Sequence, residues 1–277
     1  MIHSLEGDFF TNLTNYMELT REFLKKRYAF IASQKCSSNP MAYCQGGIYN
    51  GHKDPSEEVG DIVLSFTASF GITALNELNI LHEGKPLHES DHVFVNEVLD
   101  FMNSKIEQYK KEDGYLYALY GTPAESLCAT QCSQYKEYFG DHEICKYGYF
   151  SNSFHMHVTA PLNPFDKQDE EFELFHKVNG GHIQYVRIND KSSINAVKWI
   201  VIRGLYKGFY QGINTVLSMC STCGSRETGL ECTCPECGSD DIVELSRLCG
   251  YIGYARKNGD TRIHSIKMKE IRERASM

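Results

Sequence analysis

Residues 220–253 read CSTCGSRETGLECTCPECGSDDIVELSRLCGYIG and carry the strongest structural signal of the chain. The stretch holds two Cys-x2-Cys pairs, Cys220 with Cys223 and Cys234 with Cys237, separated by ten residues. Each pair brings two sulfur atoms to one side of a tight turn. The glycine that follows each pair can adopt the backbone conformation that the turn requires. The sequence therefore predicts that these four thiolates close a tetrahedral zinc shell.

Four thiolates leave no open coordination position, so the predicted zinc is structural rather than catalytic. A structural zinc contributes on the order of 10 kcal/mol to the folding of a small module, which can rigidify a segment too short to bury a core. The alternative is two buried pairs of thiols without a metal. Cys232 breaks the spacing, and we interpret it as a thiol outside the site, with substitution for Cys234 as the alternative.

The composition is that of a globular chain. It has 277 residues, of which 42% are hydrophobic and 23% charged, so it predicts one major core plus a small module and excludes disorder and coiled coil as overall descriptions. Five of the eleven cysteines lie between Cys220 and Cys237, which favours metal binding in a reducing compartment over disulfides. No long apolar run and no signal-peptide profile is seen, so we expect a cytoplasmic protein without a membrane segment.

The charge distribution argues against nucleic acid as the main partner, because the net charge is -8 and backbone phosphates are held chiefly by Lys and Arg. The basic residues are concentrated at the end: residues 247–277 hold eight Lys or Arg against three Asp or Glu. This basic tail could meet a phosphate-bearing ligand or an acidic partner, and it is equally consistent with a solvated end segment.

Helical and strand patterns alternate along the chain. Apolar residues three or four apart predict helices over 13–31 and 94–109, and helical patterns follow over 123–139, 165–178 and 192–209. Runs rich in β-branched and aromatic residues predict strands over 115–120, 149–158 and 181–188. The alternation predicts an α/β core with largely buried strands.

Residues 247–253, RLCGYIG, resemble the C-terminal fingerprint of glycyl radical enzymes. The Cys-Gly-Tyr core at 249–251, preceded by a four-cysteine module, is similar to that of anaerobic (class III) ribonucleotide reductases in particular. Four further segments resemble the second half of that family in the right order: YGTPAES at 120–126, SNSFH at 151–155, GGHI at 180–183 and YQGIN at 210–214. The resemblance covers most of the chain.

The resemblance implies a fold and a radical site. Residues 1–215 would be the C-terminal half of a ten-stranded α/β barrel, residues 216–240 a zinc ribbon, and residues 241–277 a glycyl radical loop with the basic tail. Gly250 would store the radical. Glycine suits this role because it has no Cβ to twist the delocalised Cα radical out of plane or to crowd its approach to a thiol. Taken alone, Gly250 would be read as a turn glycine with positive φ.

The implied activity is the anaerobic reduction of ribonucleoside triphosphates by an oxidoreductase. An activating enzyme that uses S-adenosylmethionine and an iron-sulfur cluster would install the radical, and formate or a thiol would supply the reducing equivalents. The thiyl cysteine and the allosteric domain belong to the family's first half, which this chain does not contain. We therefore expect a split or truncated large chain that works with an N-terminal partner, assembles as a homodimer and is inactive alone.

Two other functions are compatible with the same motifs. One is a replacement radical subunit, although such proteins need little beyond the glycine domain. The other is a zinc-ribbon adaptor that binds nucleic acid and has no enzyme activity. The stretch between Cys223 and Cys234 argues against the adaptor, because it has no aromatic residue to stack on a base.

Smaller candidates come from the upstream segments. Thr122 and Glu125 fit a capping box at a helix start, where Glu125 could instead serve proton transfer during loss of the 2' hydroxyl and Thr122 could bind substrate. Asn152 and His155 are candidate substrate contacts. On the predicted strand they are three residues apart and should project to opposite faces, so at most one should point inward. His182 and the pair Asn76–Glu77 rest on the resemblance alone.

Overall fold

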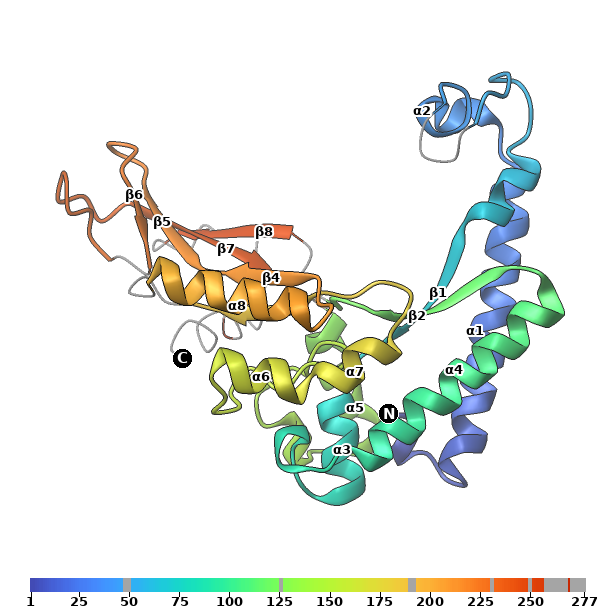
Figure 1. Ribbon diagram of the computed structural model, residues 1–277, viewed down its shortest axis with the longest axis horizontal. Coiled ribbons are helices and arrows are strands. Elements are labelled where there is room, and N and C mark those ends of the chain that lie inside the picture. Colours follow the sequence, from blue (N-terminus) through green and yellow to red (C-terminus); the bar gives the residue numbers. More distant parts are fainter. Residues whose placement is uncertain are drawn as a thin grey trace. The chain divides into compact units, whose positions relative to one another are not determined.

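The computed structural model describes residues 1–46, 51–124, 127–188, 193–229, 232–248, 251–256 and 269 (Figure 1). The helices are α1 (Phe9–Ala32), α2 (Pro40–Tyr43), α3 (Leu75–Glu83), α4 (Val93–Asp113), α5 (Leu127–Phe139), α6 (Pro164–Glu170), α7 (Phe172–Lys177) and α8 (Ile194–Tyr206). The strands are β1 (Thr67–Ile72), β2 (Leu116–Gly121), β3 (Gln184–Arg187), β4 (Gln211–Asn214), β5 (Val216–Cys220), β6 (Arg226–Thr228), β7 (Ile242–Leu248) and β8 (Tyr251–Arg256). The predicted α/β content is confirmed.

The chain divides into two compact units. Unit 1 comprises residues 1–71 and 97–120, and unit 2 comprises residues 72–96 and 121–277. No helix within the described ranges is both long and apolar enough to cross a bilayer.

Unit 1 is organised around a buried ion pair between α1 and α4. The Arg21 guanidinium donates from Nε and Nη2 to the Asp113 carboxylate at 2.6 and 2.7 Å, and both side chains are about nine-tenths buried. Asp113 also accepts a hydrogen bond from the Tyr117 hydroxyl on β2 at 3.0 Å. The guanidinium carbon lies 4.4 Å from the centre of the Tyr109 ring. These contacts fix α1 against α4 and β2.

We expect Asp113→Asn to lower the free energy of unfolding of unit 1 by roughly 2 kcal/mol at pH 7, because it leaves a buried guanidinium without its main counter-charge. The effect is smaller than for an isolated charge because Glu112 stays 2.8 Å from Arg21. Hydrogen bonding to Arg21 lowers the pKa of Asp113 below its usual 3.8. The difference in unfolding free energy between the wild type and Asp113→Asn is therefore complete above about pH 4, the pKa of an unfolded Asp. It disappears as the pH falls through the lower pKa that Asp113 has in the folded state.

Urea unfolding at pH 7 and pH 3, with hydrogen exchange of α1 to assign the effect to unit 1, measures this difference. Glu22→Gln is the matched control, because it removes the partner of an exposed ion pair with Lys25 on the same helix. Equal stabilities of wild type and Asp113→Asn at pH 7 would contradict the assignment.

Unit 2 holds two sheets. In the first, β3 and β4 are parallel, with Gln184 opposite Gln211 and Arg187 opposite Asn214, and α8 connects them. Gly204 of α8 allows close packing on β4, because a Cβ there would lie 2.6 Å from the Gln211 side-chain oxygen. Gln168 of α6 donates to the same oxygen at 2.7 Å and to the Ile200 carbonyl at 3.0 Å. The fully buried Gln168 thus ties α6 to α8 and to β4.

The second sheet has the strand order β6-β5-β7-β8 and is antiparallel throughout (orange to red in Figure 1). Cys220 at the end of β5 pairs with Ile242 at the start of β7, and Leu248 at the end of β7 pairs with Tyr251 at the start of β8. The sheet therefore runs from the cysteine-rich segment to the strands on either side of residues 249–250.

The described strands lie in three separate sheets, so the half of a ten-stranded barrel stays a prediction. The predicted helices over 13–31, 94–109 and 192–209 are confirmed as α1, α4 and α8, and the predicted strands over 115–120 and 181–188 as β2 and β3. The single helix predicted over 165–178 is two helices, α6 and α7, which meet at Glu171.

Two further predictions are wrong. Residues 149–158 form no strand: Ser153 has a left-handed φ of 48°, and consecutive residues 151–154 are all buried, so the segment does not alternate between two faces. The helix predicted from residue 123 begins at Leu127 instead. Ala124 has φ 55°, which a helix cannot accommodate, so Thr122 is not the helix N-cap.

Candidate functional site

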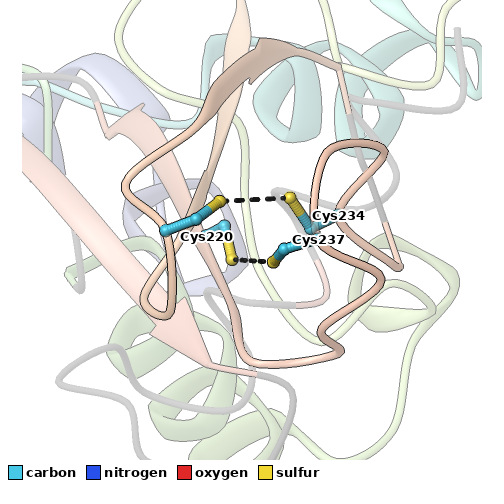
Figure 2. Close-up of side chains that lie close together, drawn as sticks. Cys220, Cys234 and Cys237 are labelled. Atoms are coloured by element: carbon cyan, nitrogen blue, oxygen red, sulfur yellow. Dashed lines mark hydrogen bonds between the residues drawn. The ribbon is translucent and has the colours of Figure 1, made fainter.

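The four predicted cysteines come together at one end of the four-stranded sheet. The sulfur atoms of Cys220, Cys223, Cys234 and Cys237 all lie within 4.8 Å of one another. The sulfurs of Cys220 and Cys237 are 3.6 Å apart, as are those of Cys223 and Cys234, so each contact joins one Cys-x2-Cys pair to the other. Figure 2 shows the side chains of Cys220, Cys234 and Cys237 converging on one point.

The two cysteine turns have the same backbone pattern. The amide of Cys220 donates to the Ser225 carbonyl at 2.9 Å, and the amide of Cys234 donates to the Ser239 carbonyl at 2.8 Å. In each turn the amide of the glycine four residues on donates to the first cysteine's carbonyl at 2.9 Å. Both glycines have positive φ, 76° at Gly224 and 71° at Gly238, which explains why glycine follows each pair.

The geometry and the donor set fit zinc. Four sulfurs at about 2.3 Å from a tetrahedral zinc are about 3.8 Å apart, and covalently bonded sulfurs are about 2.05 Å apart, so the observed 3.6 Å matches a metal shell and excludes disulfides. Amides of Cys223 and Thr222 lower the pKa of Cys220 to about 6. A hydrogen bond from the Ser239 amide lowers the pKa of Cys237. Burial and the neighbouring sulfurs outweigh this effect and raise the pKa to about 12. Four sulfurs at this spacing form a donor set that a tetrahedral zinc would accept as thiolates.

Cys232 is exposed and does not belong to the sulfur cluster, as its spacing predicts. Gly250, the predicted radical site, lies outside the described residues, and so does Glu125. The described residues nearest to Gly250 are Leu248 and Tyr251, which are paired between β7 and β8. Six residue steps along β7 put Leu248 about 20 Å from Ile242, which is opposite Cys220. A metal at the cysteines is therefore too far from Leu248 to touch it.

Thr122, Asn152 and His155 lie close together in unit 2. The Asn152 side-chain amide donates to the carbonyl of Pro123, directly after Thr122, and the His155 amide donates to the Asn152 carbonyl at 2.9 Å. Asn152 is 5% exposed and the His155 side chain 13% exposed. The alternation of a strand does not set the directions of these two side chains, because the segment is not a strand, so the expectation that at most one of them points inward stays a prediction. The structure thus groups the three predicted substrate contacts.

The backbone around this group is strained. Ala124 and Ser153 both have left-handed φ values, 55° and 48°, although neither is a glycine. Gly121 allows the two segments to approach, because a Cβ there would lie 2.8 Å from the Ser153 hydroxyl oxygen. Strained backbone of this kind collects at functional sites, where neighbouring structure holds it in place.

Glu171 is a residue that the sequence analysis missed. It is fully buried between α6 and α7, and its carboxylate oxygen Oε2 lies 3.2 Å from Nδ1 of His155. In the sequence it is one of several acidic residues in KQDEEFE, 167–173, and nothing there distinguishes it from its solvated neighbours. It is recognised only in the structure, where the junction of α6 and α7 brings Glu171 next to His155.

The residues that rest on resemblance alone have structural partners. Glu77 is buried on α3 and accepts hydrogen bonds from the Ser151 amide at 3.0 Å and the Ser151 hydroxyl at 2.7 Å, while burial raises its pKa. Asn76 accepts a hydrogen bond from the Leu87 amide at 3.0 Å. His182 packs against Phe175 with ring centres 3.6 Å apart, and burial lowers its pKa. Glu77 thereby holds the Ser151 end of the segment that carries Asn152 and His155.

Comparisons with known sequences agree with the motifs. A model of the anaerobic ribonucleoside-triphosphate reductase family matches residues 2–276. The reductase of Enterobacteria phage T4 is 29% identical over 97% of this chain and 44% of its own length. The reductases of Salmonella typhimurium and Escherichia coli are 31% and 30% identical over 90% of this chain and 37% of their own lengths. The chain thus spans 37 to 44% of the length of these relatives.

Solved structures show the same fold relationship. The anaerobic ribonucleotide reductase from Thermotoga maritima with glycerol in the active site superimposes with a TM-score of 0.60 and 19% identity, over 96% of this chain and 39% of that one. The same enzyme in complex with dATP and CTP superimposes with a TM-score of 0.58 and 20% identity, over 96% and 41% of the two chains.

Proposed function

This chain belongs to the anaerobic ribonucleoside-triphosphate reductase family, and we propose that it is the radical-bearing portion of such a reductase. The observation that carries the proposal is the four-stranded sheet. It has four convergent cysteine sulfurs at one end, and the strands on either side of Cys249-Gly250 pair at the other. The fingerprint RLCGYIG supplies the glycine, and the cysteines supply the structural support that a radical-bearing segment needs.

In this proposal zinc is held by Cys220, Cys223, Cys234 and Cys237 and fixes the end of β5 to the start of β7. Residues 1–215 act as the C-terminal half of the barrel, 216–240 as the zinc ribbon, and 241–277 as the radical loop and basic tail. Gly250 stores the radical, which an activating enzyme using S-adenosylmethionine and an iron-sulfur cluster installs. The protein works in the cytoplasm.

The substrates are ribonucleoside triphosphates, which become deoxyribonucleoside triphosphates. The radical on Gly250 takes a hydrogen atom from a cysteine thiol of the remaining reductase portion, and the thiyl so formed takes the 3' hydrogen of the ribose. The 2' hydroxyl then leaves as water, and formate or a thiol supplies two reducing equivalents. Thr122, Asn152 and His155 contact the substrate, and Glu125 assists proton transfer. The assembled enzyme is a homodimer, and this chain alone has no turnover.

Electron paramagnetic resonance tests the radical assignment. After anaerobic incubation with the activating enzyme, S-adenosylmethionine and a reductant, we expect a doublet signal, because one hydrogen remains on the glycine Cα. Addition of the missing reductase portion and CTP with formate should then give dCTP. Omission of S-adenosylmethionine is the control. A silent spectrum from zinc-loaded protein, with an activating enzyme that is active on a complete reductase, would contradict the proposal.

A further inference from the structure

Helix α8 has an exposed apolar side. Six large apolar residues in α8 and shortly after it are between 40% and 90% exposed, and we call them the α8 face: Ile194, Trp199, Ile202, Leu205, Tyr206 and Tyr210. At 3.6 residues per turn, the five that belong to the helix fall within an arc of about 140°. The buried residues Ile200 and Gly204 lie on the opposite side. A helix that is apolar on all sides is usually covered on all sides, so the α8 face needs a partner.

Two of the three cations in and next to α8 are held away from the α8 face. Arg203 donates from Nη2 to both oxygens of the Asp169 carboxylate at 2.7 Å, and the Lys207 ammonium lies 2.7 Å from one of them, so both cations are held against α6. Lys198 is the third cation and is exposed within the arc. Interface centres have few charges and are enriched in Trp and Tyr, and the α8 face has this composition.

The area of the α8 face is sufficient for a stable contact. Residues of these types at these exposed fractions present roughly 800 Å², more than the 300–600 Å² of the largest apolar patch on a typical monomer. A standard interface buries about 800 Å² of each partner. Single exposed apolar residues are ordinary, whereas a continuous patch of this size indicates an interaction surface.

The α8 face is complementary to a second copy of itself. In a two-fold symmetric contact both copies use the same face, and an axis at Ile202 makes the two α8 helices antiparallel. Trp199 of one copy then lies opposite Leu205 of the other, because both are three residues from the axis. Lys198 lies opposite Tyr206 for the same reason. The ammonium group thus meets the face of an aromatic ring, which attracts a cation, and does not meet the lysine of the second copy.

We propose that the α8 face is the contact surface of a homodimer of this chain, with the two α8 helices antiparallel about Ile202. The proposal rests on the proposed function only for the expectation that the assembled enzyme is a homodimer. The area, the composition and the charge complementarity are properties of this chain's own residues. The remaining reductase portion is the alternative occupant.

Sedimentation equilibrium of the zinc-loaded full chain, from about 1 to about 100 µM, tests the proposal, and we expect a dimer with a Kd of about 10 µM or tighter. Trp199 is the only tryptophan of the chain, so its emission should shift to shorter wavelength as the dimer forms. A chain that stays monomeric at the highest concentration would overturn the proposal, and so would a dimer with unchanged Trp199 emission. Neither outcome depends on a variant. If the emission of such a monomer shifted on addition of the remaining reductase portion, the α8 face would belong to that contact.

Two substitutions test the centre of the contact. Ile202→Lys puts two ammonium groups opposite each other at the axis and should weaken the dimer at least about tenfold. Leu19→Lys is the matched control, because Leu19 is an exposed apolar residue of a helix in unit 1, and it should leave the affinity unchanged. Equal dimer affinities of the wild type and Ile202→Lys, with equal zinc content, would overturn the proposal.

The contact between Lys198 and Tyr206 tests the antiparallel arrangement. Lys198→Glu should weaken the dimer about tenfold and Lys198→Arg should not, because the face of the ring attracts a cation and repels an anion. A dimer that Lys198→Glu leaves unchanged would overturn this arrangement.

The dimer surface and the proposed function can fail separately. A monomeric chain that still gives the radical doublet after activation would reject the dimer surface and leave the radical assignment standing. A dimer that Ile202→Lys weakens, in a chain that never forms a radical, would instead uphold the surface and reject the reductase proposal.

Discussion

Replacing Cys220 and Cys237 together by serine is expected to abolish zinc binding and to unfold the sheet of β5, β6, β7 and β8. These two residues supply one sulfur from each cysteine turn, and their sulfurs are 3.6 Å apart. Structural zinc contributes on the order of 10 kcal/mol to a small module, comparable with the whole stability of an ordinary domain. The buried hydrophobic cluster described at this end of the sheet consists of Cys220, Cys234 and Ile242, so two of its three members are candidate metal ligands.

Metal analysis of the purified protein measures the zinc, and hydrogen exchange over residues 216–256 measures the sheet. We expect about one zinc per wild-type chain and none in the double variant, with β5 and β7 exchanging as an unfolded segment. Cys232→Ser is the matched control, because Cys232 lies in the same module but outside the sulfur cluster, and it should keep both zinc and protection. A double variant with normal exchange in β7 would show that the metal does not hold this sheet.

Exposure of the activated protein to air is expected to cut the backbone at Gly250. A carbon-centred radical reacts with molecular oxygen, and the resulting peroxyl species leads to scission at the residue that carried the electron. The product would be a chain shortened by the segment after Gly250, visible by mass spectrometry. In Gly250→Ala we expect no doublet and no cleavage, because a Cβ crowds the approach of the activating enzyme and twists the delocalised system.

Gly253→Ala is the control for this experiment. Gly253 belongs to the same fingerprint but is a β8 residue opposite Ser246, so the variant should still be activated and cut at Gly250. Cleavage at another residue would show that the radical is stored on that residue instead of Gly250. A full-length chain after activation has been verified by the doublet would reject Gly250 as the storage site.

The sequence could predict those features whose signal is local. The apolar period of α1 and the Cys-x2-Cys spacing each act within a few residues. The structure contains both the helix, with Leu13, Met17 and Tyr28 buried, and the cluster of four sulfurs. The metal itself and the radical on Gly250 stay predictions, supported by donor chemistry and by the family to which the chain belongs.

The failed predictions depend on contacts between distant segments. Residues 149–158 have the composition of a strand, but the Ser151 amide bonds to Glu77 and the Ser151 carbonyl accepts from Ala74, 74 and 77 residues away. These partners satisfy backbone groups that a neighbouring strand would otherwise satisfy. The buried, aromatic segment can therefore have an irregular backbone. The contact of Glu171 with His155 was equally hidden, because it depends on how α6 and α7 meet.

The positive φ angles of Ala124 and Ser153 imply a compromise between the stability of the fold and its function. Glycine would adopt either conformation with less steric cost, so each alanine or serine side chain is retained at a conformational cost of about 1 kcal/mol or more. A consensus search for stabilising changes would single out both positions as faults to correct. Engineering the chain for a higher melting temperature at these two residues would thus risk loosening the backbone that groups Thr122, Asn152 and His155.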